Sequence, residues 1–286
     1  MHSAENVQRA AVLGSGTMGH GIAQVLAMAG IHTLLYDVQE PALEAARAKM
    51  RANLDQGVEK GKVTAEVRER ALSALEFTTD LSKAIKRAEV VIEAVPEDLA
   101  LKRTLFERIG RLASDVMLAT NTSSLSVAKI AEVARSPERV LGLHFFNPVH
   151  VMKLVEIVRW SGTSRHVLNL AVDLVARLGK EPIVVEDVPG FASSRLGIAI
   201  GLEAMRMLEA GVASADDIDK AMTLGYGFPM GPLRLTDLVG LDVRLSIAEY
   251  LARELGPRFD PPQILRDKVA RGELGKKSGR GFYEWS

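Results

Sequence analysis

A glycine-rich turn near the N-terminus constrains the fold of this chain more than any other feature. The turn, GSGTMG at 14–19, directly follows the apolar run RAAVLG and leads into the helical pattern GIAQVLAMAG. Glycines at GxGxxG spacing permit a tight strand-to-helix turn and let backbone N–H groups approach a pyrophosphate, which the positive end of the helix dipole also attracts. Alone the spacing is a weak signal, because glycine-rich turns are common. The predicted contacts are Gly14, Ser15, Gly16, Thr17, Met18 and Gly19.

The acidic residue Asp37 strengthens this prediction and selects a cofactor. It ends the next apolar run, HTLLYD, close to the roughly 20-residue spacing at which an acid binds the adenosine ribose of a dinucleotide. A carboxylate accepts a hydrogen bond from the 2′-hydroxyl of NAD but repels the 2′-phosphate of NADP, and the following Val38-Gln39 supplies no cation to offset that repulsion. We therefore predict NAD as the cofactor. The alternative is a β-α-β turn without a ligand, in which Asp37 is solvated.

Short apolar strands alternate with helical patterns through the first two-thirds of the chain. The strands are rich in β-branched or bulky apolar residues, and the helices between them include 42–60 and 98–113. This alternation is typical of a Rossmann-type α/β fold, in which helices cover both faces of a mostly parallel sheet. The predicted strands are RAAVLG, HTLLYD, EVVIEAV, DVMLATN, RVLGLHFF and KEPIVVED.

The pattern changes at Pro189-Gly190, after which the chain is predicted to be helical. We therefore predict an NAD-binding domain at 1–187 and an all-helical C-terminal domain at 188–286, which would bind substrate. The first helix after the boundary carries apolar residues on more than one face, which predicts burial against a second subunit. The predicted helices are 191–210, 214–223 and about 233–255.

The composition excludes several classes of function. The formal net charge is +0, so no general attraction to nucleic acid or to an anionic membrane is expected. The chain has no cysteine, which excludes disulfides, a thiolate nucleophile and a cysteine-ligated zinc site. No apolar run reaches the ~18 residues of a membrane span, and the N-terminus lacks the apolar segment of a signal peptide. We therefore expect a cytoplasmic protein with no metal site.

A histidine and a glutamate occupy neighbouring apolar strands. His144 lies in LGLHFF and Glu156 in KLVEIV, on either side of Asn147-Pro148. If 140–146 and 153–158 pair antiparallel about a turn near residue 150, the two side chains meet on one face of the sheet. A carboxylate that orients an imidazole and stabilises its protonated form creates a general base for a hydroxyl proton. Together with NAD, this base indicates alcohol oxidation; the alternative is a histidine whose hydrogen bonds are satisfied within the core.

Two further features follow strands of the predicted sheet at its carboxyl edge, where ligands bind in such folds. Glu97 comes just after EAVP, and the polar cluster Asn121-Thr122-Ser123-Ser124 comes just after DVMLAT. We predict that both belong to the site. The alternative for the cluster is a loop that caps a helix.

Six segments together resemble the L-3-hydroxyacyl-CoA dehydrogenases, in particular the bacterial 3-hydroxybutyryl-CoA dehydrogenases. The resemblance implies an NAD-dependent enzyme that reversibly oxidises an L-3-hydroxyacyl-CoA, short-chain in this subgroup, to the 3-oxoacyl-CoA in fatty-acid or butanoate metabolism. It also implies a homodimer formed through the C-terminal domain, with substrate bound between the domains. The segments, in the family's order over nearly the whole chain, are GSGTMGHGIAQ, NTSSL, HFFNPV…MKLVE, DVPGF…RL, GYGFPMGP…DLVGLD and GKKSGRGFYEW.

The resemblance also implies roles for individual residues. His144 resembles the family's catalytic base and Glu156 its orienting partner, while Ser123 resembles the serine that contacts the substrate oxygen and the nicotinamide. Lys60 resembles a lysine that binds the CoA phosphates, and Asn53 falls where the family has a serine that contacts CoA. The further residues that resemble NAD contacts are Glu97, Lys102, Asn147 and Lys277.

One position departs from the family pattern. The family usually has PGFxxNR, with the asparagine near the reacting carbons of the substrate, whereas this chain has PGFASSR, which places Ser194 there. A hydroxyl is shorter than a planar amide and has fewer donors. We therefore predict activity with an altered rate or substrate preference. His150 lies outside the family motif and is predicted to be a loop residue.

Two alternative functions keep the NAD site. In one, the same fold acts on a sugar acid such as L-gulonate or on a dicarboxyl-CoA; a sugar-acid enzyme would have no use for Lys60. In the other, the chain is a structural protein that binds NAD without turnover. Such a protein would gain nothing from keeping His144, Glu156 and Ser123 together among apolar strands.

Overall fold

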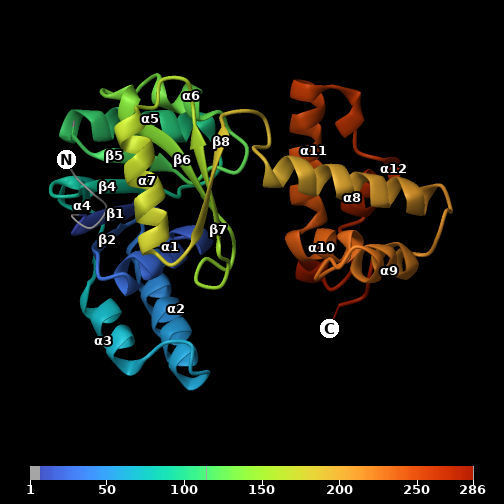
Figure 1. Ribbon diagram of the computed structural model, residues 1–286, viewed down its shortest axis with the longest axis horizontal. Helices are drawn as coiled ribbons and strands as arrows, with labels where there is room; N and C mark the ends of the chain where they lie inside the picture. The colour runs from blue at the N-terminus through green and yellow to red at the C-terminus, as the bar shows by residue number, and fades with distance from the viewer. Residues whose placement is uncertain (1–6, 114, 286) are drawn as a thin grey trace. The chain divides into compact units, whose positions relative to one another are not determined.

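The computed structural model describes residues 7–113 and 115–285 of the 286-residue chain. The chain divides into two compact units, Met1–Asp187 and Val188–Ser286 (Figure 1). Within the described residues, no helix is both long enough and apolar enough to cross a membrane.

The first unit contains one eight-stranded sheet in the order β3-β2-β1-β4-β5-β6-β7-β8. All neighbouring strands pair in parallel except β6 and β7, which are antiparallel. The predicted mostly parallel α/β sheet is therefore confirmed. The strands are β1 (Arg9–Leu13), β2 (His32–Tyr36), β3 (Leu75–Thr78), β4 (Val90–Glu93), β5 (Met117–Thr120), β6 (Val140–Phe145), β7 (Leu154–Arg159) and β8 (Glu181–Glu186).

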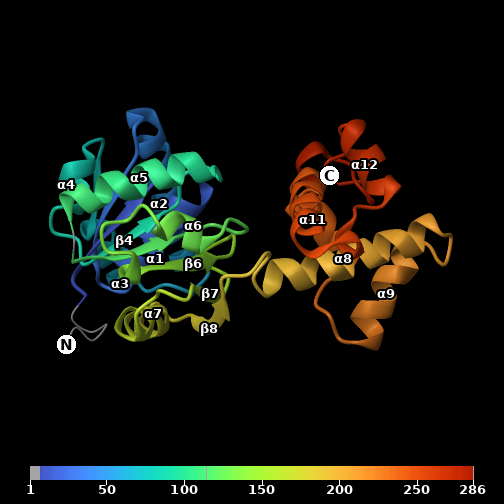
Figure 2. The same cartoon turned by 90° about the horizontal axis from the view of Figure 1, so that it is seen from above.

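Helices cover both faces of this sheet because its central strands are apolar on both sides. All four residues of β4 and of β5 are buried, as expected for strands covered on both faces. One continuous core joins the sheet to α1, α2 and α7, and Figure 2 shows α5 and α7 on opposite sides of the sheet. The helices are α1 (Thr17–Met28), α2 (Glu40–Glu59), α3 (Ala65–Ser73), α4 (Leu81–Ile85), α5 (Leu99–Leu112), α6 (Val127–Ala131) and α7 (Arg165–Arg177).

Three elements between 60 and 90 were not predicted from the sequence. They are α3, the edge strand β3 and the five-residue helix α4. Strand β3 has the sequence LEFT, and Thr78 is its one buried residue. Unlike the equally short β4 and β5, this strand is not a buried apolar run, so its assignment depends on pairing with β2.

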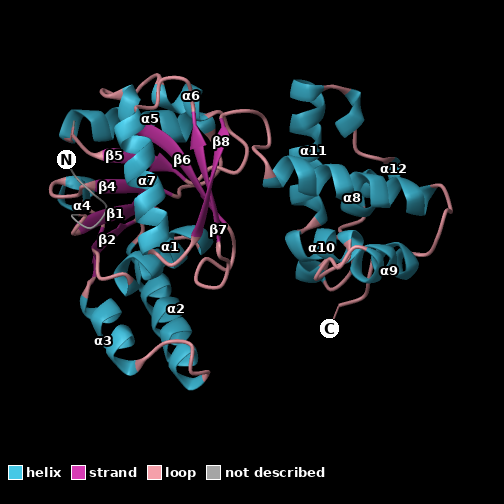
Figure 3. Ribbon diagram, viewed as in Figure 1, coloured by secondary structure: helices cyan, strands magenta, loops and turns pink. Residues whose placement is uncertain are grey.

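The second unit is helical, as predicted, and Figure 3 shows helices joined by loops in this unit. Its core contains Ile198 and Leu202 of α8 packed with Leu233 and Leu251 of later helices. The prediction of one helix at about 233–255 was wrong. Gly240 has φ 108°, outside the helical region, and divides the segment into two helices. The helices are α8 (Ser193–Glu209), α9 (Ala215–Gly225), α10 (Pro232–Val239), α11 (Leu241–Leu255) and α12 (Gln263–Ala270).

Candidate active site

The glycine-rich turn connects β1 to α1, and the surroundings of its three motif glycines differ. Gly14 has φ +100°, and a Cβ there would lie 2.6 Å from the Ala94 carbonyl oxygen. A Cβ on Gly19 would lie 1.7 Å from the Gly14 carbonyl oxygen. Gly16 differs, because a Cβ there would meet no protein atom within 4 Å. Packing inside the protein therefore does not require glycine at position 16, whereas close approach of a ligand to the backbone would.

The first turn of α1 is open to an anion. Its N-cap residue is Gly16, which supplies no side-chain hydrogen bond, and the first turn carries no acidic residue. Backbone N–H groups at a helix N-terminus lack intrahelical partners and attract negative charge. Together with the bare Gly16, this arrangement fits the pyrophosphate of a dinucleotide.

Asp37 follows β2 and lies against the same turn. Its Oδ2 accepts hydrogen bonds from the Ser15 backbone N–H at 2.8 Å and from the Ser15 hydroxyl at 2.7 Å, while Oδ1 accepts from the Gln39 N–H at 3.1 Å. These bonds fix a carboxylate beside the turn at the carboxyl edge of the sheet. An acceptor in this place suits the ribose hydroxyls of NAD.

His144 and Glu156 lie directly opposite each other in the antiparallel pair of β6 and β7. The predicted cross-strand pairing is therefore confirmed. His144 Nδ1 and Glu156 Oε2 are 2.7 Å apart, and the two residues are 7% and 0% exposed. With Nδ1–H donating to the carboxylate, Nε2 is the basic nitrogen of the ring. The pair thus has the geometry of a general base held by a buried acid.

The turn after β5 is organised by one carboxylate. Glu97 Oε1 accepts from the Thr122 hydroxyl at 2.5 Å and from the backbone N–H groups of Ser123 at 3.0 Å and Ser124 at 3.2 Å. The Ser123 hydroxyl lies farther away, at 3.5 Å from the same oxygen. Burial by itself would raise the pKa of Glu97, but the Lys102 charge and these hydrogen bonds outweigh it and lower the pKa.

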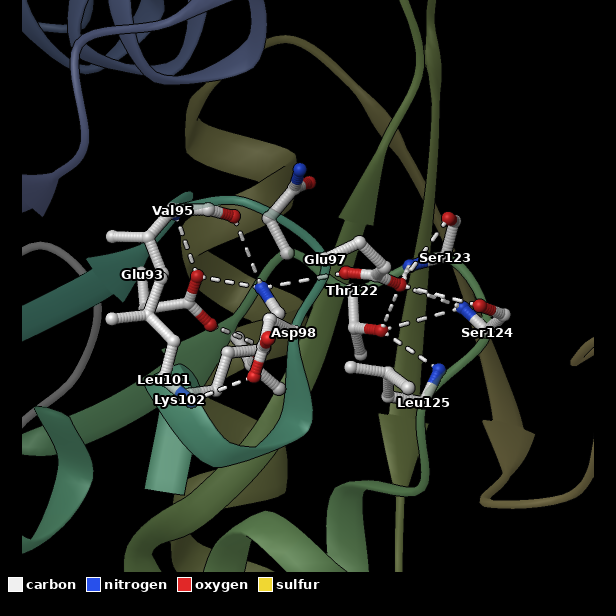
Figure 4. Close-up of polar contacts among 12 residues, drawn as sticks. Glu93, Val95, Glu97, Asp98, Leu101, Lys102, Thr122, Ser123, Ser124 and Leu125 are labelled. Atoms are coloured by element: carbon white, nitrogen blue, oxygen red, sulfur yellow. Dashed lines mark hydrogen bonds and ion pairs between the residues drawn. The ribbon is translucent and has the colours of Figure 1, made fainter. Parts of the chain in front are cut away.

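Lys102, a predicted cofactor contact, is buried beside two glutamates. The residue is 1% exposed, and its Nζ is 2.7 Å from Glu93 Oε1 and 3.4 Å from Glu97 Oε2. Sequence reasoning missed Glu93, which ends β4 and is fully buried. The available signal was a lone carboxylate at the end of the apolar run VVIE. Figure 4 shows Lys102 between the two glutamates.

The turn of the β6–β7 hairpin rests on α1. A Cβ on Gly21 of α1 would lie 2.8 Å from the Val149 Cβ, so the absence of a side chain permits this close packing. The Lys180 ammonium donates to the carbonyl oxygens of Val149 at 2.6 Å and Met152 at 2.7 Å. Asn147 and His150, in the same turn, are exposed. Exposure of His150 agrees with its prediction as a loop residue.

The other predicted residues lie on both units. In the first unit, Asn53 of α2 donates to the Gln24 side chain at 3.3 Å, and Lys60 is an exposed residue that follows the last turn of α2. In the second unit, Ser194 lies in the first turn of α8 and is half-buried. Lys277 is also in the second unit, with its Nζ 2.6 Å from Asp242 Oδ2.

Comparison with known proteins gives matches over nearly the whole chain. Residues 9–188 match the family described as "3-hydroxyacyl-CoA dehydrogenase, NAD binding domain", and residues 190–285 match "3-hydroxyacyl-CoA dehydrogenase, C-terminal domain". A 3-hydroxybutyryl-CoA dehydrogenase of Mycobacterium tuberculosis is 44% identical over 98% of this chain and 99% of its own length. A 3-hydroxyadipyl-CoA dehydrogenase of Escherichia coli is also 44% identical over 98% of this chain, which spans 59% of that longer protein.

Solved structures give the same result. The crystal structure of (S)-3-hydroxybutyryl-CoA dehydrogenase from Ralstonia eutropha superposes with a TM-score of 0.94 at 38% identity. The match covers 98% of this chain and 99% of that chain. The likeness therefore extends over both units of the fold.

Proposed function

This chain belongs to the 3-hydroxyacyl-CoA dehydrogenase family, and we propose that its own substrate is a short-chain L-3-hydroxyacyl-CoA such as 3-hydroxybutyryl-CoA. It is an NAD-dependent oxidoreductase that converts a 3-hydroxyacyl-CoA to the 3-oxoacyl-CoA. The short-chain assignment is supported by the relatives from M. tuberculosis and R. eutropha, which are named for 3-hydroxybutyryl-CoA. The relative named for 3-hydroxyadipyl-CoA supports a dicarboxyl-CoA as a second candidate substrate.

The observation that carries the proposal is the buried His144–Glu156 pair. We assign His144 as the base that removes the proton from the 3-hydroxyl group, through Nε2. Glu156, 2.7 Å from Nδ1, holds the ring in one orientation and stabilises the positive charge that the ring acquires. Because Glu156 is 0% exposed, water screens this interaction weakly.

The cofactor-binding residues proposed are those whose geometry fits NAD. The backbone of residues 14–19 would hold the pyrophosphate, and Asp37 would accept from the ribose. Bound NAD supplies the hydride acceptor. Ser123 would donate its hydroxyl to the substrate oxygen, because its 3.5 Å contact with Glu97 is the weakest of the contacts in that turn. The family resemblance adds Glu97, Lys102, Asn147 and Lys277 to this set.

The CoA part of the substrate would bind through α2, where exposed Lys60 offers a cation for phosphate and Asn53 a polar contact. The second unit would contribute Ser194 and a dimer interface. Leu196 and Ile200, one helical turn apart on α8, are 63% and 36% exposed. Helices α10 and α11 carry further exposed apolar residues, Leu235, Leu238, Val239 and Val243. We propose that a second copy of the chain covers these residues and the exposed residues of α8, since exposed apolar side chains gathered at an interface are covered by a partner.

Two experiments test the proposal. The first follows nicotinamide absorbance with NADH and acetoacetyl-CoA for the parent and for His144→Gln; the variant should lose roughly 10²–10⁴-fold in kcat while retaining NADH binding. Activity of the parent with L-gulonate but not with acetoacetyl-CoA would reject a 3-hydroxyacyl-CoA as the substrate. Higher activity with 3-hydroxyadipyl-CoA than with 3-hydroxybutyryl-CoA would favour the dicarboxyl-CoA as the substrate. The other experiment is sedimentation of the parent and of Leu196→Asp, in which a dimeric parent and a monomeric variant are expected.

A further inference from the structure

One arginine of the second unit carries a buried charge that no carboxylate balances. Arg244, in the first turn of α11, is 7% exposed. Its Nε has no hydrogen-bond partner among the residues that the structure describes. Burial lowers the pKa of Arg244 to about 10, and no carboxylate in the described part of the chain offsets this effect. The guanidinium is therefore still protonated at neutral pH, although an unpaired buried charge destabilises a folded protein.

A glycine on α8 makes room for this guanidinium. Helices α8 and α11 pack against each other (Figure 2), and a Cβ on Gly197 would lie 3.1 Å from Arg244 Nη1. That separation is shorter than the roughly 3.5–4.0 Å of an ordinary contact between side-chain carbons. Gly197 and Arg244 together therefore place a cation directly against the backbone of α8.

The cation lies within one helical turn of the position assigned to the reacting end of the substrate. Ser194, which the resemblance places near the reacting carbons, and Gly197 are three residues apart on α8. Residues at this spacing share one side of a helix and are separated along its axis by about 4.5 Å. Three carbon–carbon bonds, each about 1.5 Å long, span a similar distance. A group three bonds beyond C3 of the acyl chain would therefore reach the turn of α8 that Arg244 contacts.

The ligand group that suits this guanidinium is a carboxylate. A guanidinium donates to a carboxylate through two parallel hydrogen bonds, and the negative charge would balance the buried positive one. In a six-carbon dicarboxyl chain the second carboxyl group is C6, three bonds from C3. A methyl group at C6 would leave the cation unpaired, and a four-carbon chain would end before reaching it.

We propose that Arg244 is a specificity-determining residue that binds the terminal carboxylate of a dicarboxyl-CoA, so that 3-hydroxyadipyl-CoA is preferred over 3-hydroxyhexanoyl-CoA. The proposal rests on the function proposed above and gives its second candidate substrate a binding residue. It does not exclude 3-hydroxybutyryl-CoA, whose chain makes no demand on Arg244. The 44% identical relative from E. coli is named for a substrate of the dicarboxyl class.

The first test compares two substrates that differ only at C6, where 3-hydroxyadipyl-CoA has a carboxylate and 3-hydroxyhexanoyl-CoA a methyl group. The kcat/KM of the parent should be at least about tenfold higher for the dicarboxyl substrate, as expected for a hydrogen bond between charged groups. Arg244→Met keeps an extended side chain without the charge and should lower this ratio at least about tenfold. A merely structural role would lower both values and leave the ratio unchanged. A parental ratio of one or less would overturn the proposal, and so would an equal ratio in parent and variant.

Binding without turnover gives a second measurement, which uses adipyl-CoA and hexanoyl-CoA because neither has the reactive hydroxyl group. The Kd of the parent for adipyl-CoA should be at least about tenfold lower than for hexanoyl-CoA. Arg244→Lys decides the matter if Arg244→Met does not fold. It keeps a charge but loses the two-pronged geometry, so the ratio of the two Kd values should lie between those of parent and Arg244→Met. The parental ratio in Arg244→Lys would show that charge alone suffices and would overturn the assignment of a paired contact.

Arg234→Met is the matched control, because it removes an exposed cation of the neighbouring helix α10 that lies over the Tyr283 ring at 4.2 Å. It should keep the parental ratio of the two Kd values. An equal fall in Arg234→Met and Arg244→Met would show a general effect of charge and overturn the proposal.

An acceptor on a second copy of the chain is the competing partner for Arg244. In that case Arg244→Met would shift the monomer–dimer equilibrium in sedimentation while the substrate ratio stayed parental, and this result would overturn the proposal. A parent that oxidises neither CoA ester would instead reject the proposed function.

Discussion

Replacing Glu156 by glutamine isolates the contribution of its charge to catalysis. The side chain keeps its size and its carbonyl acceptor, so His144 Nδ1 can still donate across the same 2.7 Å. What disappears is the negative charge that stabilises the imidazolium formed when His144 takes the hydroxyl proton. Glu156 is fully buried, so solvent offers little replacement for that charge.

The expected loss follows from two limits. A hydrogen bond to a charged group stabilises by about 1.5–3 kcal/mol against about 0.5–1.5 kcal/mol for a neutral one, and the difference gives a lower limit of about 1 kcal/mol. Two unit charges about 4 Å apart attract by about 4 kcal/mol at an effective dielectric constant of about 20, which gives the upper limit. Since about 1.4 kcal/mol corresponds to a factor of ten, kcat should fall about 5- to 10³-fold.

The assay is steady-state oxidation of 3-hydroxybutyryl-CoA by NAD, the direction in which His144 takes the proton, repeated with substrate deuterated at C3. If proton transfer at His144 is slowed, the chemical step becomes rate-limiting and the deuterium isotope effect on kcat of Glu156→Gln should exceed that of the parent. The control is Glu186→Gln on the adjacent strand β8, where the carboxylate pairs with Arg159 and the two side chains are 58% and 47% exposed. This exposed pair contributes about 0–1 kcal/mol to stability, so kcat should stay within about twofold. A folded Glu156→Gln with parental kcat and isotope effect would refute the assignment of the pair.

Three further outcomes are expected. Gly16→Ala should fold normally but bind NADH at least about tenfold more weakly, because a Cβ at position 16 meets no protein atom within 4 Å. Gly14→Ala should lower the melting temperature by several degrees, because a Cβ at position 14 would lie too close to Ala94. Calorimetry and NADH fluorescence separate the two effects, and equal NADH binding by the parent and Gly16→Ala would argue against the pyrophosphate site. The pKa of Glu97 lies below its usual value, so ionised Glu97 stabilises the fold above the usual pKa, and this stabilisation is lost as the pH falls through the lowered pKa. The difference in unfolding free energy between the parent and Glu97→Gln should therefore shrink on acidification. A difference that stays constant with pH in denaturant titrations would contradict this. Ser194→Asn should change kcat/KM measurably for at least one acyl length; identical values for every length would exclude a role for this position.

The sequence predicted those features that depend on local pattern. The pairing of His144 with Glu156 followed from the position of the turn between two apolar strands, because antiparallel register is fixed once the turn centre is known. The glycine-rich turn was likewise visible as a strand, a motif and a helix in succession. Both predictions needed information from only a short stretch of consecutive residues.

Other features could not be predicted, because they depend on contacts that the local sequence does not specify. Lys102 occurs on a helix with many charged residues, LALKRTLFERIGRL, where a lysine normally points to solvent. Its burial becomes evident only when the end of β4 places Glu93 beside it. The break at Gly240 was missed for a related reason, since an isolated glycine within an apolar pattern is compatible with a continuous helix.

The close packing of Gly21 against Val149 has a consequence for the distance over which the reaction takes place. The turn of the hairpin that carries His144 packs so closely against α1 that only a glycine hydrogen fits between Gly21 and Val149. Lys180 binds the carbonyl oxygen of Val149 in the same turn. An added methyl group at position 21 would push the hairpin outward, and a displacement of about 1 Å can slow an enzyme about 100-fold. We therefore expect the separation between the proposed base and the bound nicotinamide to depend on Gly21, a residue that is proposed to bind neither.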